Sequence, residues 1–404
     1  MKKIISLAAL LAMVLTFSAG CGGDTTGGDT NTPATGDNVV KVGIFEPASG
    51  ENGAGGKQEV LGIRYAHSLQ PTVEIAGETY TVELVEVDNQ SDTTKAVTAA
   101  QNLVNSDVSV VLGSYGSGVS IAAGDIFKSA EIPAIGISCT NPQVTLGNDY
   151  YFRVCFLDPF QGTVMANYAM EELGADSAYV ITQLGDDYSS GLGNYFVQAF
   201  EGMNGTVHTA EFQTGEVDFS AILTNAMNSD ADVIFAPSAI ATAPLIIQQA
   251  RQMGITMPIL AGDTWENESI ITNAGQHATD VYLSTFFDEN DTANPAAAEF
   301  VGGFKEWLNA DAQNLTNNGG SDGVAAVSAL GFDAYNVALQ ALAAAASPTG
   351  ADVQAALPGV EYNGVTGSVT FNENGDANKD MAYIKTINVE TGAFDFLKTQ
   401  SVAE

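Results

Sequence analysis

The regular alternation of strand-like and helix-like segments is the feature that most restricts what this chain can fold into. Between residues 39 and 285, short runs of β-branched and apolar residues are repeatedly followed by segments of helical period. Strands at this spacing, joined by helices, form parallel sheets that are covered by helices on both faces. The pattern therefore predicts an α/β fold.

The alternation occurs in two series, which predicts two doubly wound lobes, and 404 residues are enough for two such cores. In the first series the predicted strands are 39–46, 79–88, 108–112 and 132–137, and the predicted helices are 57–69, 93–105 and 119–130. After a strand at 151–156, the second series has predicted strands at 178–184, 206–212, 232–236, 257–261 and 280–285, and predicted helices at 161–173, 191–203, 219–228 and 244–253. Helical periodicity returns at 296–309 and 324–345.

The C-terminal part follows a different pattern. Residues 365–372 and 382–389 alternate polar and apolar side chains, as antiparallel strands do. We expect these two segments to form a hairpin. A hairpin added to α/β lobes indicates that the chain crosses between the lobes more than once.

The first 38 residues are typical of an export signal followed by a tether. Residues 1–20 have a basic start and an apolar run that is too short to span a bilayer comfortably, so they are predicted to be a signal peptide. The run ends in Ser18-Ala19-Gly20-Cys21, which resembles a bacterial lipobox and implies that Cys21 is lipidated. Ser18 departs from the usual leucine, and an ordinary cleavage site is the alternative. Residues 21–38 are then the lipidated N-terminus and a flexible tether.

Charge and cysteine content narrow the choice of partners. The 13 Lys and Arg residues face 48 Asp and Glu residues, and a surface with a formal charge of −35 repels polyanions, so we expect no nucleic-acid partner. Apart from Cys21 the chain has Cys139 and Cys155. They are either a disulfide or two free thiols, and neither belongs to a metal-binding spacing.

Catalytic motifs are absent from the sequence. The histidines His67, His208 and His277 are scattered, and no nucleophile elbow or phosphate-binding loop occurs. Asn372-x-Asn374-x-Asp376 opens like a calcium loop, but the later positions of such a loop lack the required Gly and Glu, which favours a simple turn. We therefore expect no enzyme activity, no metal and no cofactor.

Two Gly- and Ser-rich turns follow neighbouring predicted strands. Gly113–Gly118 opens a helix, and Ser138-Cys139-Thr140-Asn141 follows the next strand. Ligands of open α/β sheets lie beyond the carboxyl ends of the strands, where the unpaired N–H groups of a helix start hold a carboxylate. Each turn alone is also explained as a helix cap, but two adjacent turns of one kind favour a ligand site.

Several segments carry a resemblance in the same order along residues 39–398. Gly262-Asp263-Thr264-Trp265 is similar to a G-D-x-W-D motif, and the other matching segments are 42–50, 88–92, 113–118, 332–335 and 364–376. Together they resemble the branched-chain amino-acid-binding family, the leucine/isoleucine/valine-binding solute receptors of ABC transporters. The resemblance implies two lobes joined by three crossovers near Leu157, Phe287 and 359–365. Lobe 1 would then be 39–157 plus 288–360, and lobe 2 would be 158–287 plus 361–404.

The resemblance also implies roles for particular residues. Ser117 and the amides of its helix start would hold a ligand carboxylate, while Ser138 and Thr140 would share the carboxylate and the ammonium. From the second lobe, Tyr188 would touch the ligand on closure and Asp263 would pair with the ammonium. As alternatives, Asp263 caps a helix and Tyr188 merely starts one.

The side-chain compartment departs from the family pattern. Gly55 stands where relatives often carry an aromatic residue, so the compartment is enlarged or moved. Tyr115 is expected to line it.

The expected function is that of a receptor anchored to the membrane on its extracytoplasmic face. It would bind a free amino acid, hydrophobic or branched-chain, by lobe closure and deliver it to an ABC permease as a monomer. The alternatives are a receptor for another small polar solute, such as a short amide, urea or an aromatic acid, and a ligand-sensing partner of a signalling protein.

Overall fold

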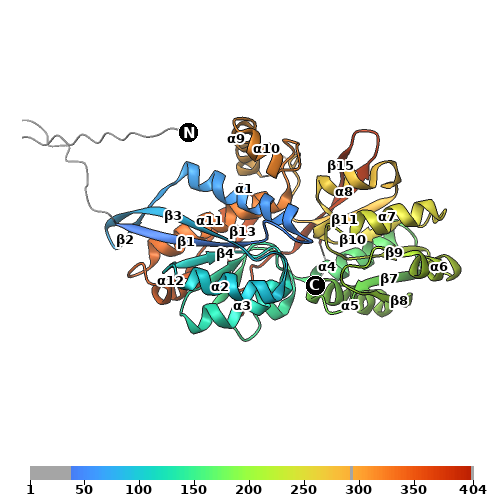
Figure 1. The fold of residues 1–404 in the computed structure, drawn as a ribbon, viewed down its shortest axis with the longest axis horizontal. Helices are drawn as coiled ribbons and strands as arrows, with labels where there is room; N and C mark the ends of the chain where they lie inside the picture. The colour runs from blue at the N-terminus through green and yellow to red at the C-terminus, as the bar shows by residue number, and fades with distance from the viewer. Residues whose placement is uncertain (1–37, 292–293, 402–404) are drawn as a thin grey trace, which may run out of the picture. The chain divides into compact units, whose positions relative to one another are not determined.

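The computed structural model describes residues 38–291 and 294–401, so the predicted signal peptide and Cys21 lie outside the described residues. The chain builds two large sheets with helices around each (Figure 1). Most neighbouring strands in both sheets are parallel, which confirms the predicted α/β class. Within the described part of the chain, no helix is both long and apolar enough to cross a membrane.

The first sheet has six strands in the order β2-β3-β1-β4-β5-β6. In chain order they are β1 (Val39–Glu46), β2 (Thr72–Ile75), β3 (Glu78–Asp88), β4 (Val110–Leu112), β5 (Ala134–Gly136) and β6 (Tyr151–Arg153). Strand β1 pairs in parallel with both β3 and β4, and only the edge strand β2 is antiparallel to its neighbour. The sequence had not predicted β2.

Apolar side chains of β1 alternate between two cores. Val42 and Ile44 are buried with Leu61 of α1 (Gly53–Leu69), whereas Phe45 is buried with residues of α2 (Thr93–Val104) and α3 (Ser117–Ser129). Successive strand residues point to opposite faces of a sheet, so these helices cover both faces. Helix α11 (Ala326–Ala344) packs along α1.

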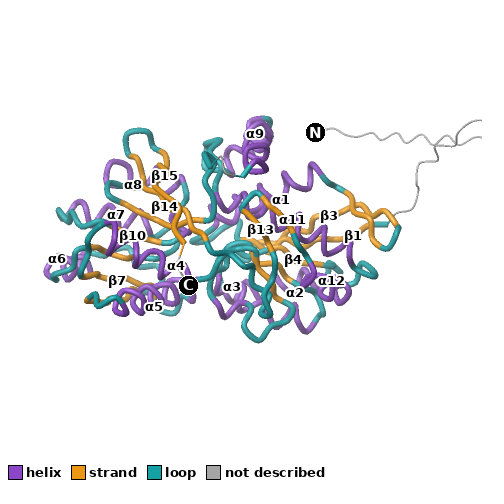
Figure 2. Tube along the Cα trace, turned by 180° about the vertical axis from the view of Figure 1, so that it is seen from behind, coloured by secondary structure: helices purple, strands orange, loops and turns teal. Residues whose placement is uncertain are grey.

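The second sheet has seven strands in the order β15-β14-β11-β10-β9-β7-β8. Its strands are β7 (Ser177–Gln183), β8 (Thr206–Phe212), β9 (Val233–Phe235), β10 (Ile259–Ala261), β11 (Val281–Thr285), β14 (Met381–Asn388) and β15 (Ala393–Ser401). The associated helices are α4 (Asp158–Asn167), α5 (Asp187–Gly202), α6 (Ser220–Asn228), α7 (Ala243–Gln252) and α8 (Glu268–Ala274). Figure 2 shows these strands from behind with α5, α6 and α7 around them.

Three further helices are α9 (Pro295–Asn309), α10 (Ala312–Asn317) and α12 (Gly350–Ala356). Helix α9 packs its aromatic residues around Tyr65 of α1, with ring centroids of Phe304 and Trp307 at 5.5 and 5.7 Å. Rings at such separations add attraction beyond the area they bury. Helix α9 is thus attached to the first lobe.

The predicted C-terminal hairpin is wrong in its pairing. Strand β13 (Gly367–Val369) pairs with β12 (Tyr362–Gly364) as a separate two-stranded sheet, whereas β14 pairs with β11 and with β15, which the sequence had not predicted. Asp333 of α11 accepts hydrogen bonds from the amides of Val365 and Thr366, both 2.9 Å, and so holds the β12–β13 turn to α11. Alternation predicts a strand but does not select its partner.

Residues 362–378 contact elements of the first lobe. Besides the bonds to Asp333, the rings of Phe371 and Phe152 in β6 lie 5.2 Å apart, and Arg153 of β6 bridges to Asp376. We therefore propose that the third crossover lies between Asn378 and Met381, later than the predicted 359–365. The first two boundaries, near Leu157 and Phe287, stay predictions.

A buried guanidinium ties β6 to two loops. Arg153 Nε donates to Asp376 Oδ1 at 2.5 Å, and its Nη1 donates to the carbonyls of Cys139 and Asn141, both at 2.7 Å. Its Nη2 donates to Thr145 Oγ1 at 2.8 Å. The segment that resembles the start of a calcium loop is instead a turn, and this turn places the Asp376 carboxylate next to the Arg153 guanidinium.

Cys139 and Cys155 are buried free thiols, so the disulfide alternative is wrong.

The substitution Asp376→Asn should lower the free energy of unfolding by about 3–5 kcal/mol, because it leaves a buried guanidinium without its counter-charge. Urea denaturation followed by circular dichroism measures the change. Asp149→Asn is the matched control, since Asp149 pairs with Lys128 at 2.8 Å on the surface, where such pairs contribute about 0–1 kcal/mol. Equal effects of both substitutions would contradict a special role for Arg153.

Candidate ligand-binding site

The loops that follow β4 and β10 face each other between the two lobes. They line one cavity with residues of both lobes, among them Tyr115, Ser117, Tyr188 and Thr264. Direct contacts cross the cavity rim: Asn141 Nδ2 donates to the Asp187 carbonyl at 2.7 Å, and Tyr115 OH donates to the Thr264 carbonyl at 3.4 Å. The lobes are therefore closed on each other here.

Ser117 is the first residue of α3 and is buried. The N-cap of α3 is Gly116, so Ser117 is not a helix cap. Its Oγ accepts a hydrogen bond from the backbone N–H of Asn141 at 3.2 Å. The hydroxyl proton of Ser117 is therefore free to be donated. Beside the unpaired amides of the first helical turn, this hydroxyl suits an anionic group.

Ser138 and Thr140 lie on the loop that Arg153 holds. The Ser138 hydroxyl donates to Glu59 Oε1 at 2.5 Å, a contact that the sequence did not predict. The Thr140 hydroxyl is buried without a hydrogen-bond partner of adequate geometry, next to the carboxyl of Asp158. The Thr140 hydroxyl is thus placed to donate either to the Asp158 carboxyl or to a ligand, whereas the Ser138 hydroxyl offers only its lone pairs.

Asp263 begins a single 3-10 turn, Asp263–Trp265, and its side chain makes no capping hydrogen bond. The helix-cap alternative is therefore wrong. Its Oδ1 accepts from Gln161 Nε2 at 2.9 Å and from Tyr188 OH at 3.0 Å, while the buried Oδ2 has no hydrogen-bond partner. Burial raises the pKa of Asp263 to about 6. A carboxylate with one unsatisfied buried oxygen suits a cationic group.

Tyr188 and Tyr115 close the cavity from opposite lobes. Tyr188 lies in the first turn of α5, where Asp186 caps the helix by accepting from the Ser189 amide at 2.7 Å. The Tyr115 ring fills the space beside Gly55, since a Cβ on Gly55 would lie 2.3 Å from it. Gly55 thus makes room for the Tyr115 ring, and the enlarged or moved side-chain compartment stays a prediction.

Sequence reasoning missed a group of buried carboxyls around these residues: Glu46 at the end of β1, Glu59 on α1 and Asp158 at the start of α4. Burial raises the pKa of Glu59 and of Asp158 to about 8, and that of Glu46 well above its usual range. The available signal was an acidic residue at the end of an apolar strand and another on the packed face of a helix. Acidic side chains are rarely fully buried unless they are paired, so sequence alone favours solvated carboxyls at these positions.

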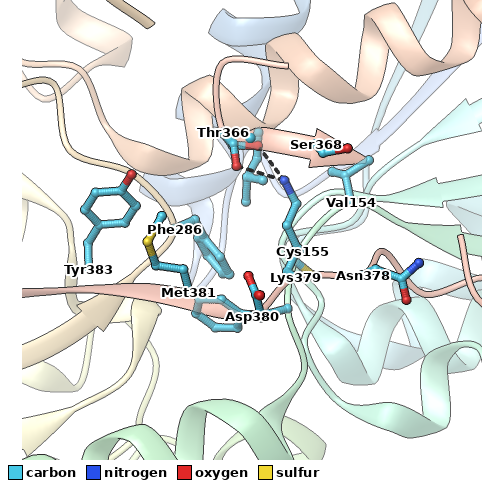
Figure 3. A pocket seen from close by; sticks show the side chains of 13 residues that line it. Val154, Cys155, Phe286, Thr366, Ser368, Asn378, Lys379, Asp380, Met381 and Tyr383 are labelled. Atoms are coloured by element: carbon cyan, nitrogen blue, oxygen red, sulfur yellow. Dashed lines mark hydrogen bonds between the residues drawn. The ribbon is translucent and has the colours of Figure 1, made fainter. Parts of the chain in front are cut away.

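A larger cavity of about 250 Å³ lies near the predicted crossover positions. Its lining includes Cys155, Phe286 and Lys379, and Figure 3 shows Lys379 directed at Thr366. The Lys379 ammonium donates to the Thr366 carbonyl at 2.8 Å. None of the predicted ligand residues lines this cavity.

Within the described residues, no cluster of three or more His, Cys, Asp or Glu side chains is placed to hold a metal ion.

Residues 39–392 match the family model of the periplasmic binding proteins. The chain belongs to the periplasmic binding protein family. This match confirms the family resemblance. The two helix-covered sheets agree with the predicted two-lobed fold of a periplasmic binding protein.

Three similar proteins show how far the likeness extends. An amino acid binding protein of Pseudomonas aeruginosa is 30% identical over 240 residues, which are 58% of this chain and 63% of that protein, so the match spans less than two thirds of its length. The structure of a leucine binding protein from Thermotoga maritima is 34% identical, with a TM-score of 0.83 over 90% of this chain and 99% of that chain. A branched-chain amino acid transporter substrate binding protein of Streptococcus pneumoniae, in complex with isoleucine, is 28% identical, with a TM-score of 0.79 over the same shares.

The affinity for a ligand whose cation pairs with Asp263 should fall as the pH is lowered from 7 to 5. Asp263 must be ionised to pair, and its pKa of about 6 lies above the usual range, so the site must release a proton below pH 6. The affinity should change by about tenfold per pH unit at most.

The groups that act on Asp263 in this titration are the donors Gln161 and Tyr188 and the carboxyls of Glu59, Asp158 and Glu266. Calorimetric titration at several pH values measures the profile. An affinity that stays constant down to pH 5 would show that Asp263 does not carry the cation.

Proposed function

We propose that this protein is an extracytoplasmic receptor that binds a free amino acid between its lobes. The observation that carries the proposal is the opposite polarity of two facing surfaces. The start of α3 offers hydroxyl and amide donors from the first lobe, and Asp263 offers a buried carboxylate oxygen from the second. A free amino acid carries a carboxylate and an ammonium on one carbon, so it matches both surfaces at once.

Each predicted residue has a role in this proposal. Ser117 and the first amides of α3 hold the ligand carboxylate, and the unpartnered Thr140 hydroxyl adds a donor. Asp263 pairs with the ammonium through Oδ2, while Tyr188 and Gln161 orient it through Oδ1. Ser138 takes part through the lone pairs of its hydroxyl, because the proton of that hydroxyl is donated to Glu59.

Ligand binding favours the closed lobes in this mechanism. The carboxylate subsite belongs to the first lobe and the ammonium subsite to the second, so only the closed state satisfies both ends. A ligand shifts a conformational equilibrium by its differential affinity for the two states, and hinge closure is the known behaviour of periplasmic binding proteins. The cavity near the predicted crossover positions should change volume as the crossing segments bend.

The proposed cellular role is delivery of the amino acid to an ABC permease by a monomer that is anchored through a lipid on Cys21. The supporting facts are the Streptococcus pneumoniae relative, named as a transporter substrate binding protein, and the lipobox-like residues 18–21. Leucine and isoleucine are the first ligands to test because similar proteins are named for or solved with them. The proposal includes no catalytic activity and no cofactor.

A thermal-shift screen of the twenty amino acids should identify a ligand, since a ligand at 100 times its Kd stabilises the fold by about 2.7 kcal/mol.

The substitution Asp263→Asn should weaken binding of the ligand found in this screen by about 3–5 kcal/mol, roughly a hundred- to several-thousand-fold, because the ammonium loses its buried partner. Isothermal calorimetry measures the loss. Asp107→Asn is the matched control, because Asp107 is exposed and distant in sequence from Asp263.

Equal affinities of the wild type and Asp263→Asn would overturn the amino-acid assignment. The ligand would then be a solute without an ammonium, such as a short amide, urea or an aromatic acid.

The substitution Cys21→Ser should release the protein from the membrane or leave its precursor unprocessed, because the thiol is the proposed site of lipid attachment. Incorporation of labelled palmitate by intact cells measures the modification. Labelling that persists in the variant would contradict the lipobox prediction.

A further inference from the structure

Gln58 of α1 contacts the second lobe, although it is not among the described residues that line the interlobe cavity. Its Oε1 accepts from Asn267 Nδ2 at 2.8 Å, and its Nε2 donates to Glu268 Oε2 at 3.0 Å and to Asn318 Oδ1 at 3.3 Å. Asn267 and Glu268 follow β10 in the second lobe, whereas Asn318 follows α10 in the first. Gln58 is 1% exposed, so its whole amide is used in a buried contact between the lobes.

The partners of Gln58 are held in place by their own elements. Asn267 is the N-cap of α8, where its Oδ1 accepts from the backbone N–H of Ser269 at 3.0 Å. Asn318 Nδ2 donates to two backbone carbonyls of the loop that follows α10, both at 2.8 Å. These bonds fix the orientation of each amide. A buried polar network that is satisfied in this way specifies one arrangement of the elements it joins.

A second contact joins the same segment of the second lobe to α11. Glu266 Oε2 accepts from the backbone N–H of Ala326, the first residue of α11, at 3.2 Å. Glu266 Oε1 accepts from Lys385 Nζ at 2.5 Å, and Lys385 also pairs with Asp288 at 3.0 Å. All four residues are buried. An ion pair therefore fixes Glu266 within its own lobe, and the start of α11 binds it from the first lobe.

The two helices that receive these contacts are closely packed. A Cβ on Gly62 of α1 would overlap the Ser328 carbonyl of α11, and a Cβ on Gly331 of α11 would overlap the Glu59 carbonyl of α1. The Ser328 hydroxyl also donates to the Gln58 carbonyl at 2.8 Å. The glycines let the two backbones approach each other, so Gln58 and the start of α11 belong to one rigid surface.

The segment that this surface holds begins with Asp263, which takes the ammonium in the proposed function. A single 3-10 turn, Asp263–Trp265, leads through Asn267 into α8. Contacts that fix Asn267 against α1 therefore also fix the position of Asp263 relative to the carboxylate subsite at Ser117. These contacts favour the closed lobes, because opening returns the amides of Gln58 and Asn267 to water.

We propose that Gln58 and Asn267 form an interlobe latch that strengthens ligand binding without touching the ligand. This inference rests on the proposed function, because the latch acts through the segment that carries Asp263. Gln58 is thus a positioning residue: it stabilises the closed lobes and holds Asp263 at the site. The latch acts equally on every ligand that requires closure, so it sets the affinity and the residence time of the ligand and not the choice between ligands.

Two substitutions remove the latch from opposite lobes. Gln58→Met keeps the length of the side chain without its hydrogen bonds, and Asn267→Ser keeps an N-cap residue on α8 without the amide that reaches Gln58. Calorimetry with leucine, or with whichever of the twenty amino acids the screen identifies, should give each variant a Kd about ten- to a hundredfold above that of the wild type. The reason is that one partner is left buried and unsatisfied in the closed state.

Two further measurements separate a latch from a general loss of structure. The double variant should lose much less than the product of the two single losses, because both residues belong to one interaction. Stopped-flow tryptophan fluorescence should place the loss in the dissociation rate, with the association rate changed by less than about threefold. Gln101→Met, at an exposed glutamine of α2, is the matched control and should bind as the wild type does.

Single losses that multiply in the double variant, or that appear in the association rate, would overturn the latch. Wild-type affinity in both single variants would also overturn it and leave the proposed function standing. If none of the twenty amino acids binds, the proposed function fails, and small-angle scattering then decides on the latch. The ligand-free Gln58→Met protein should have a larger radius of gyration than the ligand-free wild type, and equal radii would overturn the latch as well.

Discussion

The buried guanidinium of Arg153 is the interaction on which much of the remaining geometry depends. It lies at the end of β6, at the edge of the first sheet, and fixes the carbonyls of Cys139 and Asn141 on the loop between Ser138 and Thr145. Its charge is balanced by Asp376, which arrives from the C-terminal part of the chain. A single ion pair therefore connects the Ser138–Thr145 loop, the sheet edge and the segment that leads to the proposed third crossover. Because both charges are desolvated, neither tolerates loss of the other.

In the proposed function, the buried carboxyls near the interlobe cavity link lobe closure to ligand binding. With the lobes closed, the carboxyls between them are removed from water, and burial raises their pKa values. The ammonium of the proposed ligand would offset this cost at Asp263. The acidic composition of the chain, with few lysines and arginines, leaves no spare cation nearby to do the same.

Most of the fold was predictable because local patterns and parallel-sheet geometry agree. The strands β1 and β8 have the predicted bounds, and the other strands of the two alternating series differ by a few residues. Helix starts were predicted too late at α1, α3, α4 and α5. Their first turns are rich in Gly, Ser and Asp, which have low helix propensity, and tertiary contacts stabilise them. These same first turns carry Ser117, Asp158 and Tyr188, so the helix ends that the pattern missed are the ends that line the site.

The sequence by itself determined the α/β class, the two lobes and the turns that carry Ser117, Ser138, Thr140, Tyr188 and Asp263. These features follow from local periodicity and from the rule that strand ends gather at one edge of a parallel sheet. Only the tertiary structure decided which strands the C-terminal segments pair with, that Asp376 reaches Arg153, and that Ser138 bonds to Glu59. Each of these contacts joins residues that are distant in sequence or lie on different elements. No local pattern encodes such contacts, because a side chain's partner and its burial depend on how the whole chain packs.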